Sequence, residues 1–281
     1  MKFGRSIGLL AALVSALCVG ALLSVAVTTK SYSESYPAVV CPPTISGLTS
    51  QISLTSKKTP FQRLQNRTTK TAPVKVLRLP VNKDSLLFNS EGVAPVVWQS
   101  KASSWAGGAV CTGPATSQWF VGGTADITTR GRLMIVNSGL SDAVVDVQSF
   151  TENGKQPLRT ITVVSKNYLV IATDSLAPGD KYLTVHVAPR SGRVNAFMID
   201  ERSKGLSSLG GDLINFAPSA SKSVMIPAIP HQIKDRSAAL PHTLRVLTPG
   251  DVDANVTAEV LSADGVFVPV GLTSRSISAG I

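Results

Sequence analysis

Short apolar runs separated by turn residues make up most of the chain after residue 72. Pro, Asn, Asp or Gly bounds each run, and none of them keeps helical periodicity over three turns. Val185 and Val187 alternate with Thr184 and His186, as in a strand with one face on a core and the other in water. Closely spaced strands with turn residues between them are typical of sandwiches and barrels, so we predict an all-β fold of Ig-like β-sandwich units. The predicted strands are Val74–Leu79, Ser85–Phe88, Val93–Trp98, Gln118–Val121, Leu133–Val136, Ala143–Phe150, Leu158–Val164, Tyr168–Ala172, Tyr182–Val187 and Val194–Ile199.

An internal repeat organises these predicted strands. A shift of 111 residues places residues 133–154 on residues 244–265 without a gap. The shift keeps the alternation of buried and exposed positions, which a slip of one residue would destroy. We therefore predict two copies of one sandwich unit. The matched pairs are Leu133 with Leu244, Gly139 with Gly250, Ala143 with Ala254, Val145 with Val256, Val147 with Ala258 and Gly154 with Gly265.

Both copies also carry the same turn signal. Asn153-Gly154 in the first copy and Asp264-Gly265 in the second tolerate the positive φ angles that a two-residue hairpin needs. We therefore expect each copy to be a strand, a connection and a second strand that ends in a hairpin turn. The pair expected to be buried is Val145 and Val256, and the pair expected to be exposed is Gln148 and Glu259.

The second copy is incomplete in this sequence. Four apolar runs follow Gly154, whereas about one further run fits between Gly265 and Ile281. A half-sandwich exposes its inner face and an unpaired edge. Two explanations stay open, namely that the chain is part of a longer protein or that the other strands are supplied from elsewhere.

The N-terminus predicts a membrane anchor. Lys2 and Arg5 precede an uncharged run from Ile7 to Val27, and a helix of these 21 residues would cover about 30 Å, the thickness of the hydrocarbon core. The two cations hold that end in the cytoplasm, so the bulk of the chain is expected outside it, at the cell membrane. The small residues of Ser24–Ala26 offer the alternative of signal-peptide cleavage, although an apolar region of about 7–15 residues is usual there.

These features divide the chain into four predicted segments. Residues 28–72 are poor in large apolar side chains, so we expect a spacer between the membrane and the first sandwich. The segments are a cytoplasmic tip and transmembrane anchor (1–30), an extracytoplasmic spacer and basic loop (31–72), a first β-sandwich domain (73–220) and a partial second repeat (221–281).

The chain is basic, with a formal charge of +10, or +8 once Lys2 and Arg5 are removed. Such a balance suggests anionic neighbours, such as envelope polymers or lipid headgroups, although solubility alone also explains it. A basic stretch in the predicted spacer could contact an anionic surface, or it could be a solvated loop. Its members are Lys57, Lys58, Arg63, Arg67 and Lys70. No nucleic-acid partner is expected.

Two cysteines are expected to form a disulfide. Cys41 and Cys111 are the cysteines of the exported part, where oxidation is possible, whereas Cys18 lies in the apolar run as a small side chain. A structural zinc site needs four ligands, and the short spacings that such a site requires are missing.

Four segments carry a likeness to known proteins, namely Trp105–Cys111, Trp119–Asp126, Gly131–Gly139 and Val194–Arg202. They resemble a family of exported actinobacterial proteins known only as a domain of unknown function. The likeness covers about residues 36–281 and is most specific in 105–154. It implies an N-terminal membrane anchor, tandem β-sandwich units and a chain longer than this one. The family has no established activity, so no functional residue carries over, and its members tend to be encoded near envelope glycosylation functions.

The search for catalytic chemistry gives little. The glycine pairs 107–108, 122–123 and 210–211 lack the lysine of a phosphate-binding loop, so we interpret them as bulges or close backbone approaches, and no Gly-x-Ser-x-Gly elbow is present. Asp200 and Glu201 are adjacent on a strand and point to opposite faces, so an ion pair of Asp200 or Glu201 with Arg202 at the surface is preferred to an acid–base pair.

The chain is expected to be no enzyme and to hold no cofactor or metal. The histidines His186, His231 and His242 are scattered, and an exposed strand position is preferred to a metal site.

The tryptophans Trp98, Trp105 and Trp119 allow two interpretations. They could form a platform that stacks on sugar rings, or they could pack in the core beside the disulfide, as tryptophan does in many sandwiches. We prefer the core, and exposure of all three would favour the platform.

Two functions remain as hypotheses. The first is a non-enzymatic structural or interaction module of the cell envelope. The second is a glycan-binding accessory to envelope polysaccharide or glycosyltransferase machinery.

Overall fold

Strands account for most of the regular structure, as the apolar runs predict. The computed structural model describes residues 14–15, 39–54, 59–66, 69–71, 78–88, 95–205, 207–227 and 243–281. These residues form strands β1 to β21 and one 3-10 turn, η1 (Thr173–Ser175), so the all-β prediction is confirmed. The described residues from 39 onward belong to one compact unit, Tyr36–Ile281.

The predicted transmembrane anchor lies outside the described residues, apart from the helical residues 14 and 15. In the described part of the chain, the search for a helix long and apolar enough to cross a membrane finds none.

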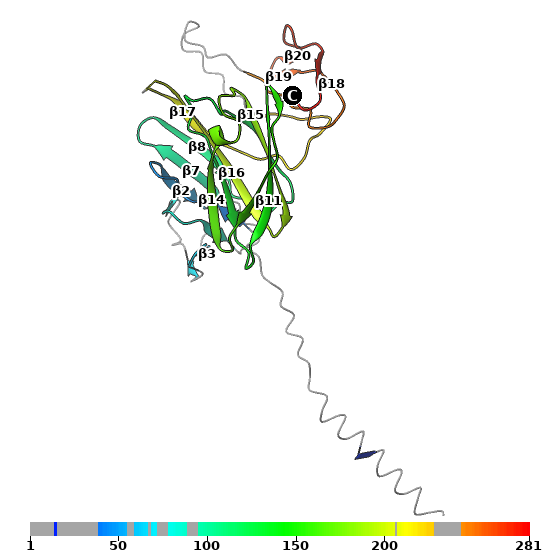
Figure 1. Cartoon of the computed structure of the whole chain (residues 1–281). Coiled ribbons are helices and arrows are strands. Elements are labelled where there is room, and N and C mark those ends of the chain that lie inside the picture. Colours follow the sequence, from blue (N-terminus) through cyan, green and yellow to red (C-terminus); the bar gives the residue numbers. More distant parts are fainter. Residues whose placement is uncertain are drawn as a thin grey trace, which may run out of the picture. The chain divides into compact units, whose positions relative to one another are not determined.

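A central antiparallel sheet of four strands organises the unit 36–281 (Figure 1). Strand β10 lies inside it and pairs with β14 on one side and β16 on the other, so that Leu133 is opposite both Ile171 and Met198. The strands in order are β14 (Asn167–Ala172), β10 (Arg132–Asn137), β16 (Val194–Lys204) and β17 (Ser207–Ile214).

Both faces of this central sheet are buried. Successive side chains of a strand point to opposite faces, and here each face enters a different core. Met134 and Val136 pack in one core, whereas Leu133 and Ile135 pack in the other. Strand β16 is divided in the same way. Its Phe197 and Ile199 join the first core, and its Val194, Ala196 and Met198 join the second.

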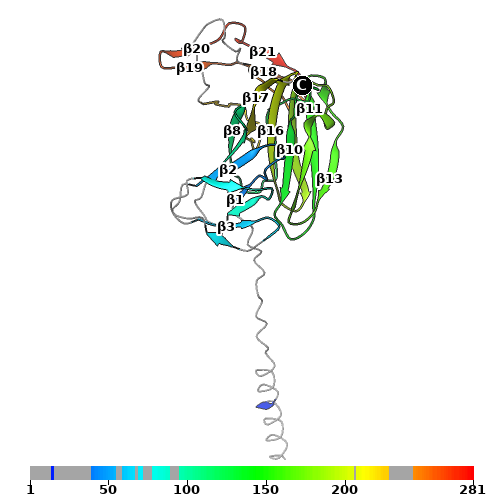
Figure 2. The ribbon, with the colours of Figure 1, turned by 90° about the vertical axis from the view of Figure 1, so that its left-hand side faces the viewer.

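The first core lies between the central sheet and two N-terminal sheets (Figure 2). One N-terminal sheet has the order β1 (Val39–Cys41), β6 (Leu86–Phe88), β3 (Pro60–Arg63) and β4 (Lys70–Thr71). The other has the order β5 (Arg78–Val81), β2 (Thr49–Ser53), β7 (Val96–Lys101) and β8 (Trp105–Val110). The ion pair of Lys101 with Glu201 ties β7 to the central strand β16.

The second core lies on the other face of the central sheet. It is closed by a sheet of order β12 (Gly154–Lys155), β11 (Ala143–Thr151), β15 (Leu183–Ser191) and β9 (Gln118–Gly123), with β13 (Arg159–Val163) also paired to β11. Gln118 joins the two sheets, because its amide group bonds the carbonyl of Val194 and the N–H of Ala196 on β16.

The predicted disulfide is confirmed. Cys41 ends β1 and Cys111 follows β8, their Cα atoms are 4.6 Å apart, and both side chains are buried in the first core. The bond therefore joins the edges of the two N-terminal sheets.

The prediction of a spacer over 31–72 is wrong in its described part. Strands β1, β2, β3 and β4 lie there, and the large apolar side chains among them are buried. Strand β2 has Ile52 as its one large apolar side chain, β3 has Phe61, and β4 has none, so these strands lack the runs on which the prediction depended. The boundary at residue 73 fails for the same reason, because β2 pairs with β5 and β7 across it. The buried residues are Val40, Cys41, Ile52, Leu54, Phe61 and Leu64.

Two further strands, β8 and β17, were missed because glycines interrupt their apolar residues. These glycines lie where the two strands cross closely, as expected for close backbone approach. A Cβ on Gly107 would lie 2.7 Å from the Cα of Asp212, and one on Gly211 would lie 2.6 Å from the ring of Trp105.

The second repeat reproduces the hairpins of the first. Two short strands, β18 (Ala254–Val256) and β19 (Val260–Ser262), correspond to the long strand β11. Strand β20 (Gly265–Phe267) corresponds to β12, and β21 (Arg275–Ile277) corresponds to β13. Ala254 pairs with Ile277 as Ala143 pairs with Val163. The strand β21 follows at a shift of 114 residues instead of 111, because the connection before it is three residues longer.

Local hydrogen bonds recur with the strands. The hydroxyl of Thr151 accepts the amide of Asn153, and the hydroxyl of Ser262 accepts that of Asp264. Asp142 accepts the amide of Ser165 at 2.9 Å, and Asp253 accepts that of Ala279 at the same distance. The turn glycines recur as well, with φ of 98° at Gly154 and 130° at Gly265.

Burial is where the two repeats differ. Residues 244–247 are not a strand, although the equivalent β10 is, because the neighbours β14 and β16 have no counterpart in the described second repeat. Val145 is buried and Glu259 is exposed as predicted, and Val256 is half-buried. The prediction that Gln148 is exposed is wrong. Its side chain is only 8% exposed, because it donates hydrogen bonds to the carbonyls of Ser149 and Gln156.

The equivalent positions Gln148 and Glu259 give a matched test of this difference. Gln148→Ala should lower the free energy of unfolding by about 1–3 kcal/mol, because it removes the two hydrogen bonds that this buried side chain donates. Glu259→Ala should change it by less than about 0.5 kcal/mol, as surface substitutions usually do. Urea denaturation measures both, and equal effects of the two changes would contradict the assignment of faces.

The disulfide gives a second prediction for the fold. Cys41→Ser should lower the free energy of unfolding by about 4 kcal/mol under oxidising conditions, since the bond closes a long loop. The melting temperature should then fall by roughly 10 °C. Thermal denaturation with and without reductant measures this difference. An equal melting temperature of the wild type in both conditions would contradict the presence of the disulfide.

Candidate functional site

A cleft of about 400 Å³ lies between the two repeats. Its walls are mostly apolar, and its size falls within the range of ligand-binding pockets. The first repeat contributes Val121, Phe150, Thr151, Glu152, Tyr182, Leu183 and Thr184. The second repeat contributes Thr243, Leu244, Arg245, Val246, Leu247, Val256, Ala258, Leu272, Arg275, Ile277 and Ile281.

The second repeat's wall of the cleft is its unfinished core. In the first repeat the equivalent side chains are buried in the second core. In the second repeat they line the cleft, and Leu244 and Val246 are 46% and 38% exposed. The equivalent pairs are Leu133 and Leu244, Ile135 and Val246, Val145 and Val256, Val147 and Ala258, and Val163 and Ile277.

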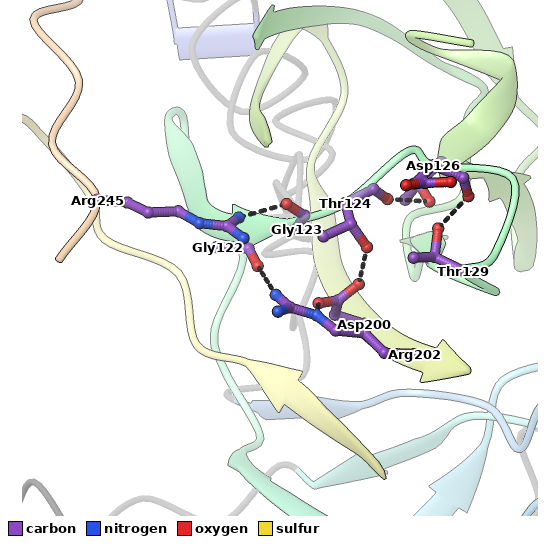
Figure 3. Close-up of polar contacts among 9 residues, drawn as sticks. Gly122, Gly123, Thr124, Asp126, Thr129, Asp200, Arg202 and Arg245 are labelled. Carbon is purple, nitrogen blue, oxygen red and sulfur yellow. Dashed lines mark hydrogen bonds and ion pairs between the residues drawn. The ribbon is translucent and has the colours of Figure 1, made fainter. Parts of the chain in front are cut away.

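Arg245 holds the second repeat against the end of β9, as Figure 3 shows. Its Nη1 donates to the carbonyl of Gly123, and its guanidinium lies 4.7 Å from the centre of the Tyr182 ring. Beside it, Arg202 bonds Asp200 at 2.8 Å and the carbonyl of Gly122 (Figure 3). Two cations therefore approach consecutive carbonyls at the end of β9, and one of them, Arg245, lines the cleft.

Neighbouring charged groups shift the pKa of Arg245 in opposite directions. Burial lowers the pKa of Arg245, and the positive charge of Arg202 acts in the same direction, whereas Asp200, Tyr182 and Glu152 raise it. An arginine keeps its proton in proteins, so the cleft carries a fixed positive charge.

Glu152 is an anion near that charge and partly offsets it. Burial alone would raise the pKa of Glu152, but hydrogen bonds from the amides of Lys181 and Tyr182 to its carboxylate leave the pKa lowered. Its oxygens are thus engaged by the turn before β15.

Sequence reasoning missed Arg245. The repeat contains a signal for it, because a shift of 111 residues places Arg245 on Met134, a buried core position. A charge at a position that is apolar in the other copy indicates a different neighbour.

A smaller hollow lies beside Trp98, on the outer face of β7 and β8. The Trp98 ring packs on Gly108, its Nε1 donates to the Ser53 hydroxyl, and the side chain is 47% exposed. Asp212 and Asn215 complete the hollow. Burial raises the pKa of Asp212, and the amides of Leu213 and Gly108 oppose that effect.

The three tryptophans do not converge. Trp105 packs against the first core as predicted, whereas Trp119 is stacked on His186 with ring centres 3.9 Å apart. Trp98 is exposed, so its predicted place in the core is wrong. Alternation explains the outcome, because Trp98 lies on the outer face of its sheet and Trp105 on the inner face.

The predicted basic stretch is only partly described. Arg63 lies on β3 and Lys70 on β4, which form a hairpin in place of the predicted loop. Lys57, Lys58 and Arg67 lie outside the described residues.

The predicted ion pair of Arg202 is confirmed with Asp200, although Asp200 is buried and not at the surface. Asp200 also accepts a hydrogen bond from the Thr124 hydroxyl at 2.6 Å, whereas Glu201 contacts Lys101, so the two carboxylates do point apart.

His186 is half-buried and bonds the Ser117 hydroxyl through Nε2. His231 and His242 lie outside the described residues, and within the described ones no three metal-ligating side chains gather.

Removing the Arg245 side chain should loosen the second repeat. Arg245→Ala deletes a charged hydrogen bond and a cation–π contact, together worth about 1–3 kcal/mol. Amide exchange in β18–β21 should speed up accordingly, while that of β10 and β16 stays unchanged. Arg275→Ala is the control, because Arg275 is exposed and bonds Gly271 within its own repeat. Equal exchange in the two variants would contradict the role of Arg245.

Comparison with known proteins identifies the family without an activity. A search of curated proteins finds no match. One solved structure, titled "Crystal Structure of Thermotoga maritima 1070", is similar over 39% of this chain and 100% of its own, at 14% identity and a TM-score of 0.33. The model of the "Family of unknown function (DUF5719)" matches residues 92–281, which is more than half of the chain. The chain therefore belongs to this family of unknown function.

Proposed function

We propose that the chain is a non-enzymatic interaction module of the cell envelope, anchored in the membrane by its N-terminal segment and built of tandem Ig-like sandwich units. The second repeat carries the proposal. Positions that are core in the first repeat line a cleft in the second, and further apolar side chains of the second repeat are exposed. Apolar surface concentrated in one region indicates an interaction site. The exposed side chains include Val252, Leu261, Val266, Phe267 and Val270.

The nature of the contact follows from this surface. An apolar contact keeps its strength when salt is added, whereas a contact between exposed charges is screened. An interaction through the second repeat should therefore survive high salt, although the chain has a formal charge of +10.

Cosedimentation with envelope fragments of the producing organism tests the proposal. The full chain should sediment with the fragments at both low and high salt. Loss of binding in high salt would assign the contact to the basic surface, and absence of binding in both conditions would refute an envelope interaction.

One observation favours a glycan-binding function as the second candidate. Trp98 presents an open ring face held by the Ser53 hydroxyl, next to the carboxylate of Asp212 and the amide of Asn215. An aromatic face with hydrogen-bonding groups at its side suits a sugar ring.

Binding to protein-free cell-wall polysaccharide separates the two candidates. Trp98→Ala should weaken such binding at least several-fold, while Trp119→Ala, which removes a ring stacked on His186, should leave it unchanged. Equal effects of the two substitutions would exclude the Trp98 hollow as the sugar site.

A further inference from the structure

Strand β14 is an edge of the central sheet. It pairs with β10 along its whole length, and among the described strands none pairs with its other side. Thr173, just after β14, donates its amide to the carbonyl of Gly131, and bonded positions alternate along an antiparallel ladder. In agreement with this alternation, the amide of Tyr168 bonds the Asn167 side chain. The residues of β14 whose N–H and C=O groups face outward are therefore Tyr168, Val170 and Ala172.

This edge lacks the features that usually prevent edge-to-edge pairing. Exposed edges of natural sheets are protected by a charge, a proline, a bulge or a covering segment. The opposite edge of the central sheet, β17, has a register shift in its pairing with β16. Strand β14 pairs with β10 in continuous register and has neither a charged residue nor a proline, and its Leu169 and Val170 are exposed. An apolar strand with outward backbone groups is open to a further strand.

The two exposed side chains of β14 lie at the rims of the two cores. Val170 is opposite Met134, which belongs to the first core, and Leu169 is opposite Ile135, which belongs to the second. Opposite residues of a ladder share a face, so a strand added beside β14 would extend both cores. Such a strand needs apolar side chains on both of its faces, as β14 itself has.

Charged residues flank β14 symmetrically. Lys166, in the turn before the strand, precedes Val170 by four positions, and Asp174, in η1, follows Val170 by four. Both side chains are exposed, and neither takes part in an ion pair within the described residues. If two copies of β14 pair antiparallel with Val170 opposite Val170, Lys166 of each copy lies opposite Asp174 of the other. Centring the pair on any other residue moves these charges out of register.

We propose that the edge of β14 pairs with the same edge of a second copy of this chain. A two-fold axis passes through Val170, so the surface is self-complementary, as an isologous contact requires. Tyr168 then bonds Ala172 of the second copy, and the outward backbone groups of both strands meet. The inference goes beyond the proposed function, because no residue of β14 lines the cleft.

Sedimentation of the full chain in a mild detergent, chosen for the predicted membrane anchor, tests the contact. The chain should form a dimer with a micromolar dissociation constant, because an edge of six residues buries little surface. Lys166→Asp and Asp174→Lys should each weaken the dimer several-fold, because each substitution places like charges opposite one another at both ends of the pair. The double variant should restore the affinity to within about twofold of the wild type, because the attraction returns with its sign exchanged.

A cross-link locates the two-fold axis. The Cα atoms of opposite bonded residues are about 5.5 Å apart, a distance that a disulfide spans. Cys18→Ser first removes the cysteine that lies outside the Cys41–Cys111 disulfide. In that background, Val170→Cys should give a covalent dimer on oxidation. Leu209→Cys, at an exposed position of the edge strand β17, is the control and should give none.

Several results would overturn the inference. These are a monomer at every concentration, a dimer that the single charge substitutions leave unchanged, and a double variant that stays as weak as the single ones. Because Lys166 and Asp174 are exposed, all three variants should keep the wild-type melting temperature, so a weakened dimer does not reflect unfolding. A dimer that forms without the Val170→Cys cross-link would assign self-association to another part of the chain and reject the β14 contact.

Discussion

The burial of β10 and β16 on both faces is the constraint on which the rest of the structure depends. A strand alternates its side chains, so two apolar faces require an apolar residue at nearly every position. Met134 and Phe197 face the N-terminal sheets, whereas Leu133 and Met198 face the sheet of β11 and β15. The two cores therefore share one wall, and neither can form without it.

The second repeat shows what this shared wall contributes. Its hairpins keep the turn hydroxyls, the positive φ of Gly265 and the bond from Ala279 to Asp253, so local chemistry suffices to form them. Among the described residues of the second repeat, no counterpart of β14 or β16 lies beside residues 243–248, and residues 244–247 form no strand. The cleft and the exposed apolar side chains follow from that missing wall, and Arg245 supplies one of the contacts that hold the repeat in place.

The sequence predicted the features that depend on neighbouring residues. The alternation at Val145 and the turn glycines identified the repeat because period and turn type are local properties. The continuous apolar runs 133–136 and 196–199 also indicate strands that are buried on both faces, because they do not alternate with polar residues. Strands β8 and β17 could not be found in this way. Gly107 is explained by its contact with Asp212 and Gly211 by its contact with Trp105, and more than 100 residues separate each pair.

The candidate site depended on contacts remote in sequence. In the sequence Gln148 looks like a surface residue, and only its hydrogen bonds to the carbonyls of Gln156 and Ser149 account for its burial. The position of Arg245 is likewise explained by its contacts with the Gly123 carbonyl and the Tyr182 ring. Trp98 and Trp105 are the same residue type, and only their places on opposite faces of one sheet make the Trp98 ring exposed and the Trp105 ring half-buried. The first core was underestimated for a similar reason, because isolated side chains such as Ile52 and Phe61 build it from short strands.

Native-state hydrogen exchange tests the central claim most directly, because it reports the opening free energy of each strand. If the central sheet joins the two cores, the slowest amides of β7 and β15 should share one opening free energy with those of β10 and β16. The amides of β18–β21 should exchange with a clearly lower opening free energy. Separate opening free energies for β7 and β15, or a single value that includes β18–β21, would contradict this account.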